Sequence, residues 1–195
     1  GANIGLYSIY YAKLMKGSVY SFEPSVFNLM QLAKNVDGNG LSDKIHIISN
    51  PLSDQVGFAK FINSNTSEGG AFSTFGVEYG FDGTRIETMY EYSLLGMSLD
   101  KMLDMGMLLE IPSMIKIDVD GIEHLILSGG EKLLRNELLK SIYIEVNENF
   151  VEQYDEINRC LTSAGFTLKE KRRSEYLSKS AAKDFQKMSN QIWVR

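Results

Sequence analysis

The stretch GANIG at residues 1–5 decides how the chain is interpreted, because two glycines bracket a short turn. An acidic residue, Glu23, follows 18 residues after Gly5 and closes the apolar run VYSF at residues 19–22. Glycine lets the backbone turn sharply from a strand into a helix and approach a ligand closely. A carboxylate at the end of the next strand can accept hydrogen bonds from both ribose hydroxyls. The layout therefore predicts a nucleotide-type binding site.

A turn of this kind leaves the C-terminal end of a buried central strand, and no residues precede it here to form that strand. We therefore expect the first strand of the sheet to be missing from this chain. The two strands that would flank it should then be poorly joined, or a neighbouring molecule should supply the segment, or the cofactor pocket should be damaged.

The composition limits the classes of protein that fit. With 195 residues and 44% hydrophobic content, we expect a single domain over residues 1–195. A net charge of −5 without a run of either sign argues against a nucleic-acid partner. No apolar stretch reaches the ~20 residues that cross a membrane, and no signal peptide is visible, so we expect a cytoplasmic protein. The one cysteine, Cys160, is expected on the buried face of a helix.

Apolar spacing predicts a helix over residues 26–36, with Val26, Leu29, Met30, Ala33 and Val36 on its apolar face. The other predicted helices cover residues 122–134, interrupted by glycines at 129–130, and residues 154–164. Predicted strands cover residues 19–22, 44–48, 114–118 and 141–146, and an antiparallel edge pair covers residues 166–171 and 191–194. The alternation of strands and helices predicts an α/β, Rossmann-like fold with a mostly parallel sheet flanked by helices.

The region between residues 56 and 76 departs from this alternation. Residues 56–62 look like an antiparallel excursion, and the Ser-, Asn- and Gly-rich residues 63–76 form a long loop. A loop of this length inside a domain is usually functional or mobile. Its two aromatic residues, Phe72 and Phe75, could cover a pocket.

The glycine turn lacks the pattern of a phosphate-binding loop. A nicotinamide-type loop needs glycine where this chain has Asn3 and Leu6, and no Walker-type lysine is present. The turn therefore suits a nucleoside without phosphates. Glu23 by itself could be a solvated strand-end acid, but its place after the turn favours ribose binding. Asn50 could meet an adenine edge, although Asn before Pro is also an ordinary turn signal.

Acidic residues gather at two further strand ends. Asp118, Asp120 and Glu123 follow the strand at 114–118, and Glu145 ends the strand at 141–146. Asp120 and Glu123 have the spacing of a helix-capping box, which is the simpler interpretation of Asp120. Asp118 and Glu145 could face one cleft, where either could act as a general base if burial raised its pKa.

The remaining candidates fit structural roles better. His46 and His124 are far apart in sequence and have no cysteine partner, so they make no convincing zinc site and are expected to pack in a strand and a helix. The acidic segment at residues 118–129 lacks oxygen ligands at two positions of a calcium loop. We therefore expect no metal site. Trp193 is expected in the core.

Together these residues resemble the FkbM-type family of S-adenosylmethionine-dependent methyltransferases over most of the chain, from residue 1 to about residue 166. The motifs that carry the resemblance are GANIG (1–5), SFEP (21–24), PLSD (51–54), SLD (98–100), IKIDVDGIE (115–123) and IE (144–145). The lysine-x-aspartate followed by glycine-x-glutamate is the most specific. Members usually carry glutamate where this chain has Asp120.

The resemblance implies a class I methyltransferase sheet in the order 3-2-1-4-5-7-6, with strand 7 antiparallel and strand 1 absent here. It implies S-adenosyl-L-methionine as cofactor and methylation of a hydroxyl on a sugar, glycan or other small molecule. Gly1, Asn3 and Gly5 would hold the methionine part, Glu23 the ribose, and the region around Asn50 the adenine.

The hypothesis for the base is Asp118, with Glu145 as the alternative. A non-catalytic or degenerate cofactor-fold module stays open as a different class of function, and a homo-oligomer is compatible with the sequence. A nicotinamide oxidoreductase is disfavoured by Asn3 and Leu6.

Overall fold

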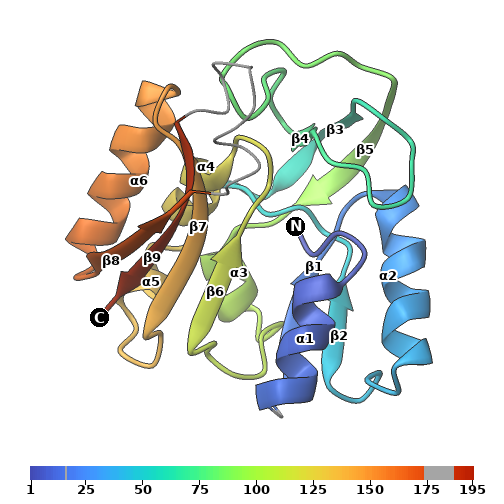
Figure 1. Cartoon of the computed structure of the whole chain (residues 1–195), viewed down its shortest axis with the longest axis horizontal. Helices are drawn as coiled ribbons and strands as arrows, with labels where there is room; N and C mark the ends of the chain where they lie inside the picture. Colours follow the sequence, from blue (N-terminus) through green and yellow to red (C-terminus); the bar gives the residue numbers. More distant parts are fainter. Residues whose placement is uncertain (16, 174–186) are drawn as a thin grey trace.

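A computed structural model describes residues 1–15, 17–173 and 187–195 of the chain. The N-terminal part consists of helix α1 (Leu6–Met15), strand β1 (Val19–Phe22), helix α2 (Val26–Gly38) and strand β2 (Ile45–Ile48). β1 and β2 pair in parallel, and both helices lie beside them (Figure 1). The predicted strand at 19–22 is confirmed, and the one at 44–48 is confirmed apart from its first residue.

A second sheet contains β6 (Met114–Ile117), β7 (Ser141–Asn147), β9 (Met188–Val194) and β8 (Thr167–Arg172), in that order. β6 and β7 are parallel, whereas β9 runs antiparallel to both β7 and β8. The predicted antiparallel pair near the C-terminus is therefore confirmed. The helix predicted over residues 154–164 is α6 (Val151–Ser163).

The helix predicted over residues 122–134 is split into α4 (Glu123–Ser128) and α5 (Glu131–Arg135). Close packing explains why glycine stands where the predicted helix is interrupted. A Cβ atom on Gly129 would lie 2.3 Å from the carbonyl oxygen of Ser53, so only glycine fits this approach.

A third, antiparallel sheet has the order β4-β3-β5, from β3 (Gly57–Asn63), β4 (Ser73–Phe75) and β5 (Tyr90–Gly96). This confirms the antiparallel excursion. The sequence did not predict β5, nor the short helix α3 (Leu99–Asp104). Strand β4 lies within the segment expected to be a loop, so that loop is limited to residues 64–72.

The expectation of a mostly parallel sheet is not confirmed. Among the described residues two strand pairings are parallel and four are antiparallel. The excursion forms its own antiparallel sheet, and β9 inserts antiparallel between β7 and β8. Because of these two features, antiparallel pairings outnumber parallel ones.

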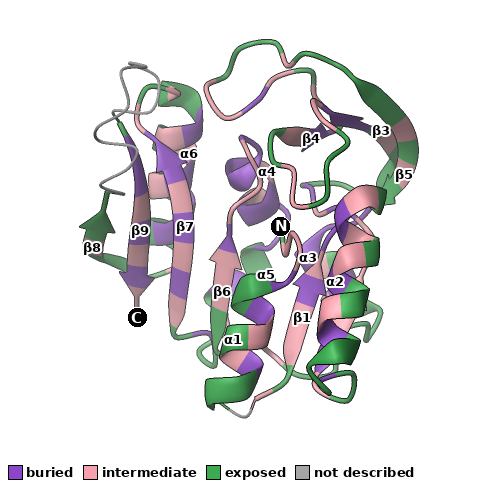
Figure 2. Cartoon of the chain, turned by 45° about the vertical axis from the view of Figure 1, so that its right-hand side comes forward, coloured by how far each residue is buried: buried purple, intermediate pink, exposed green. Residues whose placement is uncertain are grey.

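β1 and β6, the two strands expected to be poorly joined, lie in separate hydrogen-bonded sheets. The first residues of the chain lie between their ends, where the Gly1 amine donates to the Asp118 carbonyl and the Ala2 N–H donates to the Phe22 carbonyl. In Figure 1 the strands follow the order β2, β1, β6, β7, β9, β8, and Figure 2 shows the same order from β1 to β8. Apart from its strand 1, this is the order that the resemblance implies.

The largest core lies between the second sheet and helices α4, α5 and α6, where β7 is largely buried (Figure 2). Trp193 and Cys160 both belong to this core, as predicted from the sequence. A smaller core joins α1, α2, β1 and β2. No helix among the described residues is long and apolar enough to cross a membrane.

Helix α2 confirms the helix predicted over residues 26–36, but Val36 is the one residue of the predicted apolar face that is buried. Val26 and Met30 are 47% and 52% exposed, whereas Asn28, Leu32 and Val36 form the buried stripe. The start of the helix is fixed by the Tyr92 hydroxyl, which accepts a hydrogen bond from the Val26 N–H. Because the stripe begins with an asparagine, apolar spacing alone identified Val36 but not the rest of the buried face.

Candidate functional site

The turn at residues 1–5 and the end of β1 meet directly. The Asn3 N–H donates a 2.7 Å hydrogen bond to Oε2 of Glu23, and the Ser25 N–H donates a 2.9 Å bond to Oε1. Glu23 is buried, with 4% of its surface exposed. Asn3 has φ of 52°, a left-handed conformation that asparagine tolerates better than most residues. The local sequence therefore folds the turn onto the strand-end acid.

Tyr92 on β5 supports this arrangement from the antiparallel sheet. Its hydroxyl donates to the Pro24 carbonyl at 2.8 Å and accepts from the Val26 N–H at 2.9 Å. These bonds hold the chain on both sides of Ser25, whose N–H binds Glu23. The antiparallel sheet thus fixes the position of the Glu23 carboxylate.

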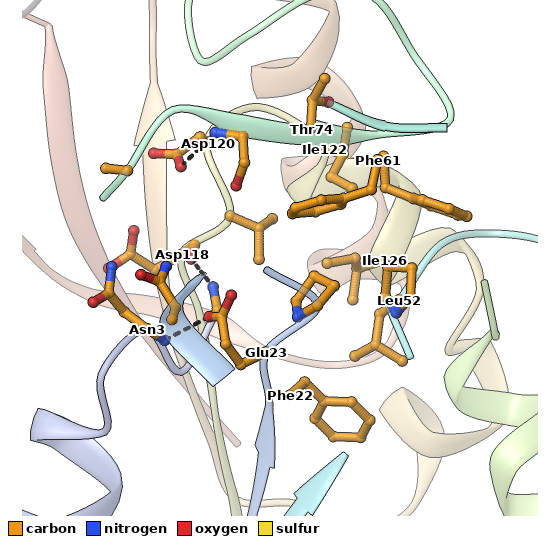
Figure 3. A pocket seen from close by; sticks show the side chains of 18 of the residues that line it. Asn3, Phe22, Glu23, Leu52, Phe61, Thr74, Asp118, Asp120, Ile122 and Ile126 are labelled. Atoms are coloured by element: carbon orange, nitrogen blue, oxygen red, sulfur yellow. Dashed lines mark hydrogen bonds between the residues drawn. The ribbon is translucent and has the colours of Figure 1, made fainter. Parts of the chain in front are cut away.

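A cavity of about 140 Å³ opens beside this carboxylate. Asn28 lines it, and the polar residues Asn3, Glu23, Asp118 and Asp120 form one side of it. Apolar residues form the other side (Phe22, Leu52, Phe61, Ile122 and Ile126), as Figure 3 shows. The cavity can therefore accept a ligand that is polar at one end and flat and apolar at the other.

The backbone N–H groups of the turn are already paired within the chain. Those of Ala2 and Asn3 donate to Phe22 and Glu23, that of Ile4 to the Asn3 side chain, and that of Gly5 to the Ala2 carbonyl. The turn thus shapes the cavity wall, and polar side chains must supply most of the contacts to a ligand.

Asp118 follows β6 and lines the cavity beside the turn, where its carbonyl accepts a hydrogen bond from the Gly1 amine. Its carboxylate forms an ion pair with Lys116. The Lys116 ammonium also lies 4.5 Å from the ring centroid of Tyr7 and 5.9 Å from that of Tyr143. These contacts orient the Asp118 side chain at the end of its strand.

Glu123 holds the loop between Asp118 and α4. Its carboxylate accepts hydrogen bonds from the Val119 N–H at 3.0 Å, the Gly121 N–H at 3.1 Å and Nε2 of Gln153 at 2.7 Å. Burial raises the pKa of Glu123 to about 7. The capping interpretation of Asp120 is wrong, because Ile122 is the N-cap residue and the Asp120 carboxylate binds residues 72 and 73 instead.

Glu145 lies near the end of β7, within electrostatic range of Asp118. Burial, followed by the negative charge of Asp118, raises the pKa of Glu145 to about 8. Glu145 does not line the cavity. A pKa near the working pH would suit Glu145 to accept a proton. Asp118, however, is the one of the two acids that lines the cavity, and this position favours Asp118 for that role.

Comparison with known proteins decides the family. A family model described as the methyltransferase FkbM domain matches residues 1–168. This chain belongs to the FkbM methyltransferase domain family. No curated protein matches the chain.

Two solved structures resemble the FkbM chain described here. The methyltransferase FkbM from Methylobacillus flagellatus KT has a TM-score of 0.63 and 13% identity, and the match covers 100% of this chain and 42% of that one. At this identity the likeness shows the fold alone. A Clostridium thermocellum protein assigned provisionally as an rRNA methylase has a TM-score of 0.49 and 12% identity, over 100% of this chain and 82% of that one. At this TM-score the second match does not support a conclusion about fold or function.

Of the site residues predicted for this FkbM domain, Gly1, Asn3, Glu23 and Asp118 line the cavity. Gly5, Asn50 and Glu145 do not.

Gly5 has a structural reason to be glycine. Its φ is 92°, and a Cβ atom there would lie 2.6 Å from Cδ1 of Leu32. Asn50 donates a 2.9 Å hydrogen bond to the Leu95 carbonyl, and the residues after it, Pro51 and Leu52, line the cavity instead.

The sequence-based prediction missed Asn28, and it gave Lys116 as part of a motif without assigning it a role in the site. Asn28 is a polar residue at a buried position of a helix, and Lys116 stands two residues before Asp118, so its side chain emerges on the same face of β6. Both signals were present in the sequence. His124 packs against Phe150 with ring centroids 6.0 Å apart, and the described residues contain no group of three or more potential metal-ligating side chains.

Proposed function

We propose that this FkbM domain binds S-adenosyl-L-methionine and transfers its methyl group to a hydroxyl oxygen of a sugar, glycan or other small molecule. Membership of the family supports methyl transfer. The choice of donor is supported by the geometry of the cavity, and the choice of acceptor by the family resemblance and by the acids at the cavity rim.

The observation that carries the proposal is the contact between the turn and Glu23. A carboxylate offers about four lone-pair positions, and the N–H groups of Asn3 and Ser25 take two of them. The other two remain for a pair of vicinal hydroxyls, as found on ribose. Glu23 is also a cavity-lining residue, so a ribose in the cavity can reach it.

The apolar side of the cavity suits the adenine ring. Phe22 is the last residue of β1, and Leu52 lies in the segment after β2. Ile122 is the N-cap residue of α4, and Ile126 lies within that helix. A planar purine between these side chains would bury apolar surface, which contributes about 25 cal/mol per Å². In this arrangement the methionine part would lie near Gly1 and Asp118.

When bound, S-adenosylmethionine would supply an electrophilic methyl group on a sulfonium centre. The contribution of the chain is to hold the acceptor hydroxyl in line with that methyl group and to accept the hydroxyl proton, for which we propose a carboxylate oxygen of Asp118. Lys116 keeps that carboxylate oriented. Positioning of this kind can lower a barrier by roughly 7–11 kcal/mol in the best intramolecular models.

Isothermal titration calorimetry with S-adenosylhomocysteine tests the donor site. We expect micromolar binding to the wild-type chain, and its complete absence would overturn the proposal. Transfer of a labelled methyl group to a panel of hydroxyl acceptors then separates an enzyme from a non-catalytic module, because a module would bind the nucleoside without transferring the label.

A further inference from the structure

Residues Gly69, Gly70, Ala71, Phe72 and Ser73, called the strap below, cross the polar side of the cavity. Gly70, Ala71 and Ser73 line it. The strap follows the exposed polar residues 66–68 and ends at Ser73, the first residue of β4. Hydrogen bonds set its position. The Asn65 side chain donates to the Ala71 carbonyl at 2.9 Å, the Ser64 hydroxyl donates to the Phe72 carbonyl at 2.7 Å, and other side chains hold the two ends of the strap.

Two asparagine side chains hold the first end of the strap. Asn28 accepts a 2.8 Å hydrogen bond from the Gly69 N–H and donates a 3.0 Å bond to the Gly70 carbonyl. Asn3 donates to the carbonyls of Gly69 and Gly70 at 3.3 and 3.2 Å. Asn28 is 4% exposed, so both polar atoms of its buried amide are used for the strap.

Asp120 holds the other end. Its Oδ2 accepts hydrogen bonds from the Phe72 N–H at 2.8 Å and the Ser73 N–H at 3.3 Å. Asp120 lies in the loop that Glu123 fixes behind Asp118. The strap is therefore tied to the same loop that carries the proposed base.

Backbone strain is concentrated at these two clamps. Among the described residues, those other than glycine with positive φ are Asn3 (52°), Asp120 (60°) and Phe72 (62°). Two of them provide clamp side chains and the third is a strap residue. Positive φ is costly for a bulky residue such as phenylalanine, and strain of this kind gathers at ligand clamps and moving segments.

The cavity under the strap is small for the proposed ligand. Its volume is about 140 Å³, whereas pockets for small molecules and cofactors range from about 300 to 1,000 Å³. Other walls belong to β1, β3 and α4, whose apolar side chains pack in the cores. No strap residue belongs to one of these apolar cores, and hydrogen bonds hold the strap in place, so it is the wall that can yield.

We propose that Asn28 and Asp120 are positioning residues that clamp the strap over the cofactor pocket, and that release of the strap from Asp120 admits and releases the cofactor. This inference rests on the proposed function for the identity of the ligand. The clamp itself concerns only contacts within the chain, and it can be tested without ligand.

Amide hydrogen exchange measured by NMR on the ligand-free chain tests the clamp. In Asp120→Asn the two N–H groups lose a charged acceptor, so we expect the amides of Phe72 and Ser73 to exchange at least about tenfold faster. Asparagine keeps the left-handed backbone, which separates loss of the carboxylate from a change of fold. Asp120→Glu restores a carboxylate and should recover part of the protection.

Binding kinetics with S-adenosylhomocysteine on a sensor surface test the role of the clamp. We expect both the association and the dissociation rate constants of Asp120→Asn to rise several-fold, and Asn28→Asp to behave alike because a carboxylate cannot donate to the Gly70 carbonyl. A purely structural defect would lower affinity without raising the association rate.

Asp100→Asn is the matched control. Its carboxylate also accepts two backbone N–H bonds, from Lys132 at 2.9 Å and Leu133 at 3.1 Å, but it does not line the cavity. We expect the control to leave strap exchange and ligand rates unchanged.

Unchanged exchange at Phe72 and Ser73 in Asp120→Asn would overturn the clamp, and faster exchange with unchanged ligand rates would overturn its role in cofactor entry. A wild-type chain that fails to bind S-adenosylhomocysteine would instead overturn the proposed function, and the exchange experiment would still decide the clamp.

Discussion

The Asn3 N–H and Oε2 of Glu23 are joined by a 2.7 Å hydrogen bond, which brings the glycine turn to the carboxyl end of β1. The two features are 20 residues apart in sequence and form one wall of the cavity. This contact connects the fold to the donor site, because the same carboxylate shapes the turn and remains available to a ribose.

Glu23→Gln should therefore weaken binding of S-adenosylhomocysteine by about 10- to 100-fold, since hydrogen bonds to a charged group contribute roughly 1.5–3 kcal/mol. An amide also cannot accept from Asn3, Ser25 and two hydroxyls together. Calorimetry measures the change. Glu91→Gln is the control, because Glu91 is an exposed residue paired with Lys60 and should bind like wild type. An affinity for Glu23→Gln within twofold of wild type would contradict the ribose assignment.

The features that the sequence predicted depend on local patterns. The strands at 19–22 and 114–118 are short apolar runs that end in an acid, and their acids, Glu23 and Asp118, do meet at the cavity. The glycine turn was recognisable because few residue types permit its backbone. In each case residues adjacent in sequence are enough to predict the feature.

The features that the sequence did not predict depend on contacts between distant residues. Asp120 meets Phe72 across 48 positions, and Asn28 meets Gly69 across 41. No local pattern tells a capping aspartate from one that holds a distant segment. Asn28 was missed for the same reason, because its partner is a loop rather than an apolar core.

Asp118→Asn should lower kcat for methyl transfer to a true acceptor by about 10²- to 10⁴-fold, the usual contribution of a general base. Steady-state kinetics measure this loss, which should appear mainly in kcat rather than in KM. Glu145→Gln is the comparison, because Glu145 lies nearby but outside the cavity lining, and it should keep most of the activity. If Asp118→Asn kept full activity and Glu145→Gln lost it, the base would have to be Glu145.

Gly121→Ala should destabilise the fold. Gly121 has φ of 130°, and a Cβ atom there would lie 2.5 Å from the Gly80 carbonyl oxygen. The backbone conformation alone costs about 1–3 kcal/mol for another residue, and the overlap adds to this. Urea unfolding measures the loss.

Gly38→Ala is the matched control for that substitution. It lies at the end of α2, with nothing within 4 Å of its Cβ position, and should be neutral or stabilising by about 0.4–1 kcal/mol. Equal stability of the two variants would show that the Gly121 turn does not need glycine.

The stability of the fold should fall as pH rises from about 5 to 7, because burial raises the pKa of Glu123 from 4.5 to about 7. The folded state then holds a proton that the unfolded chain has released, so its stabilising contribution is complete below pH 4.5 and is lost as pH rises through 7. One such group changes the free energy of unfolding by about 1.4 kcal/mol per pH unit within this window. Glu145, with a pKa raised to about 8, acts in the same direction.

Glu123→Gln should remove one proton from this dependence. Urea unfolding at pH 5, 6, 7 and 8 compares the slopes of the variant and the wild type, and the variant should be flatter between pH 5 and 7. Its absolute stability should also fall by about 1–3 kcal/mol, because an amide cannot accept hydrogen bonds from Val119, Gly121 and Gln153 together. The slope is therefore the informative quantity. Parallel curves for the two proteins would mean that Glu123 is ionised in the folded state, with the two backbone N–H groups and Gln153 offsetting the cost of its burial.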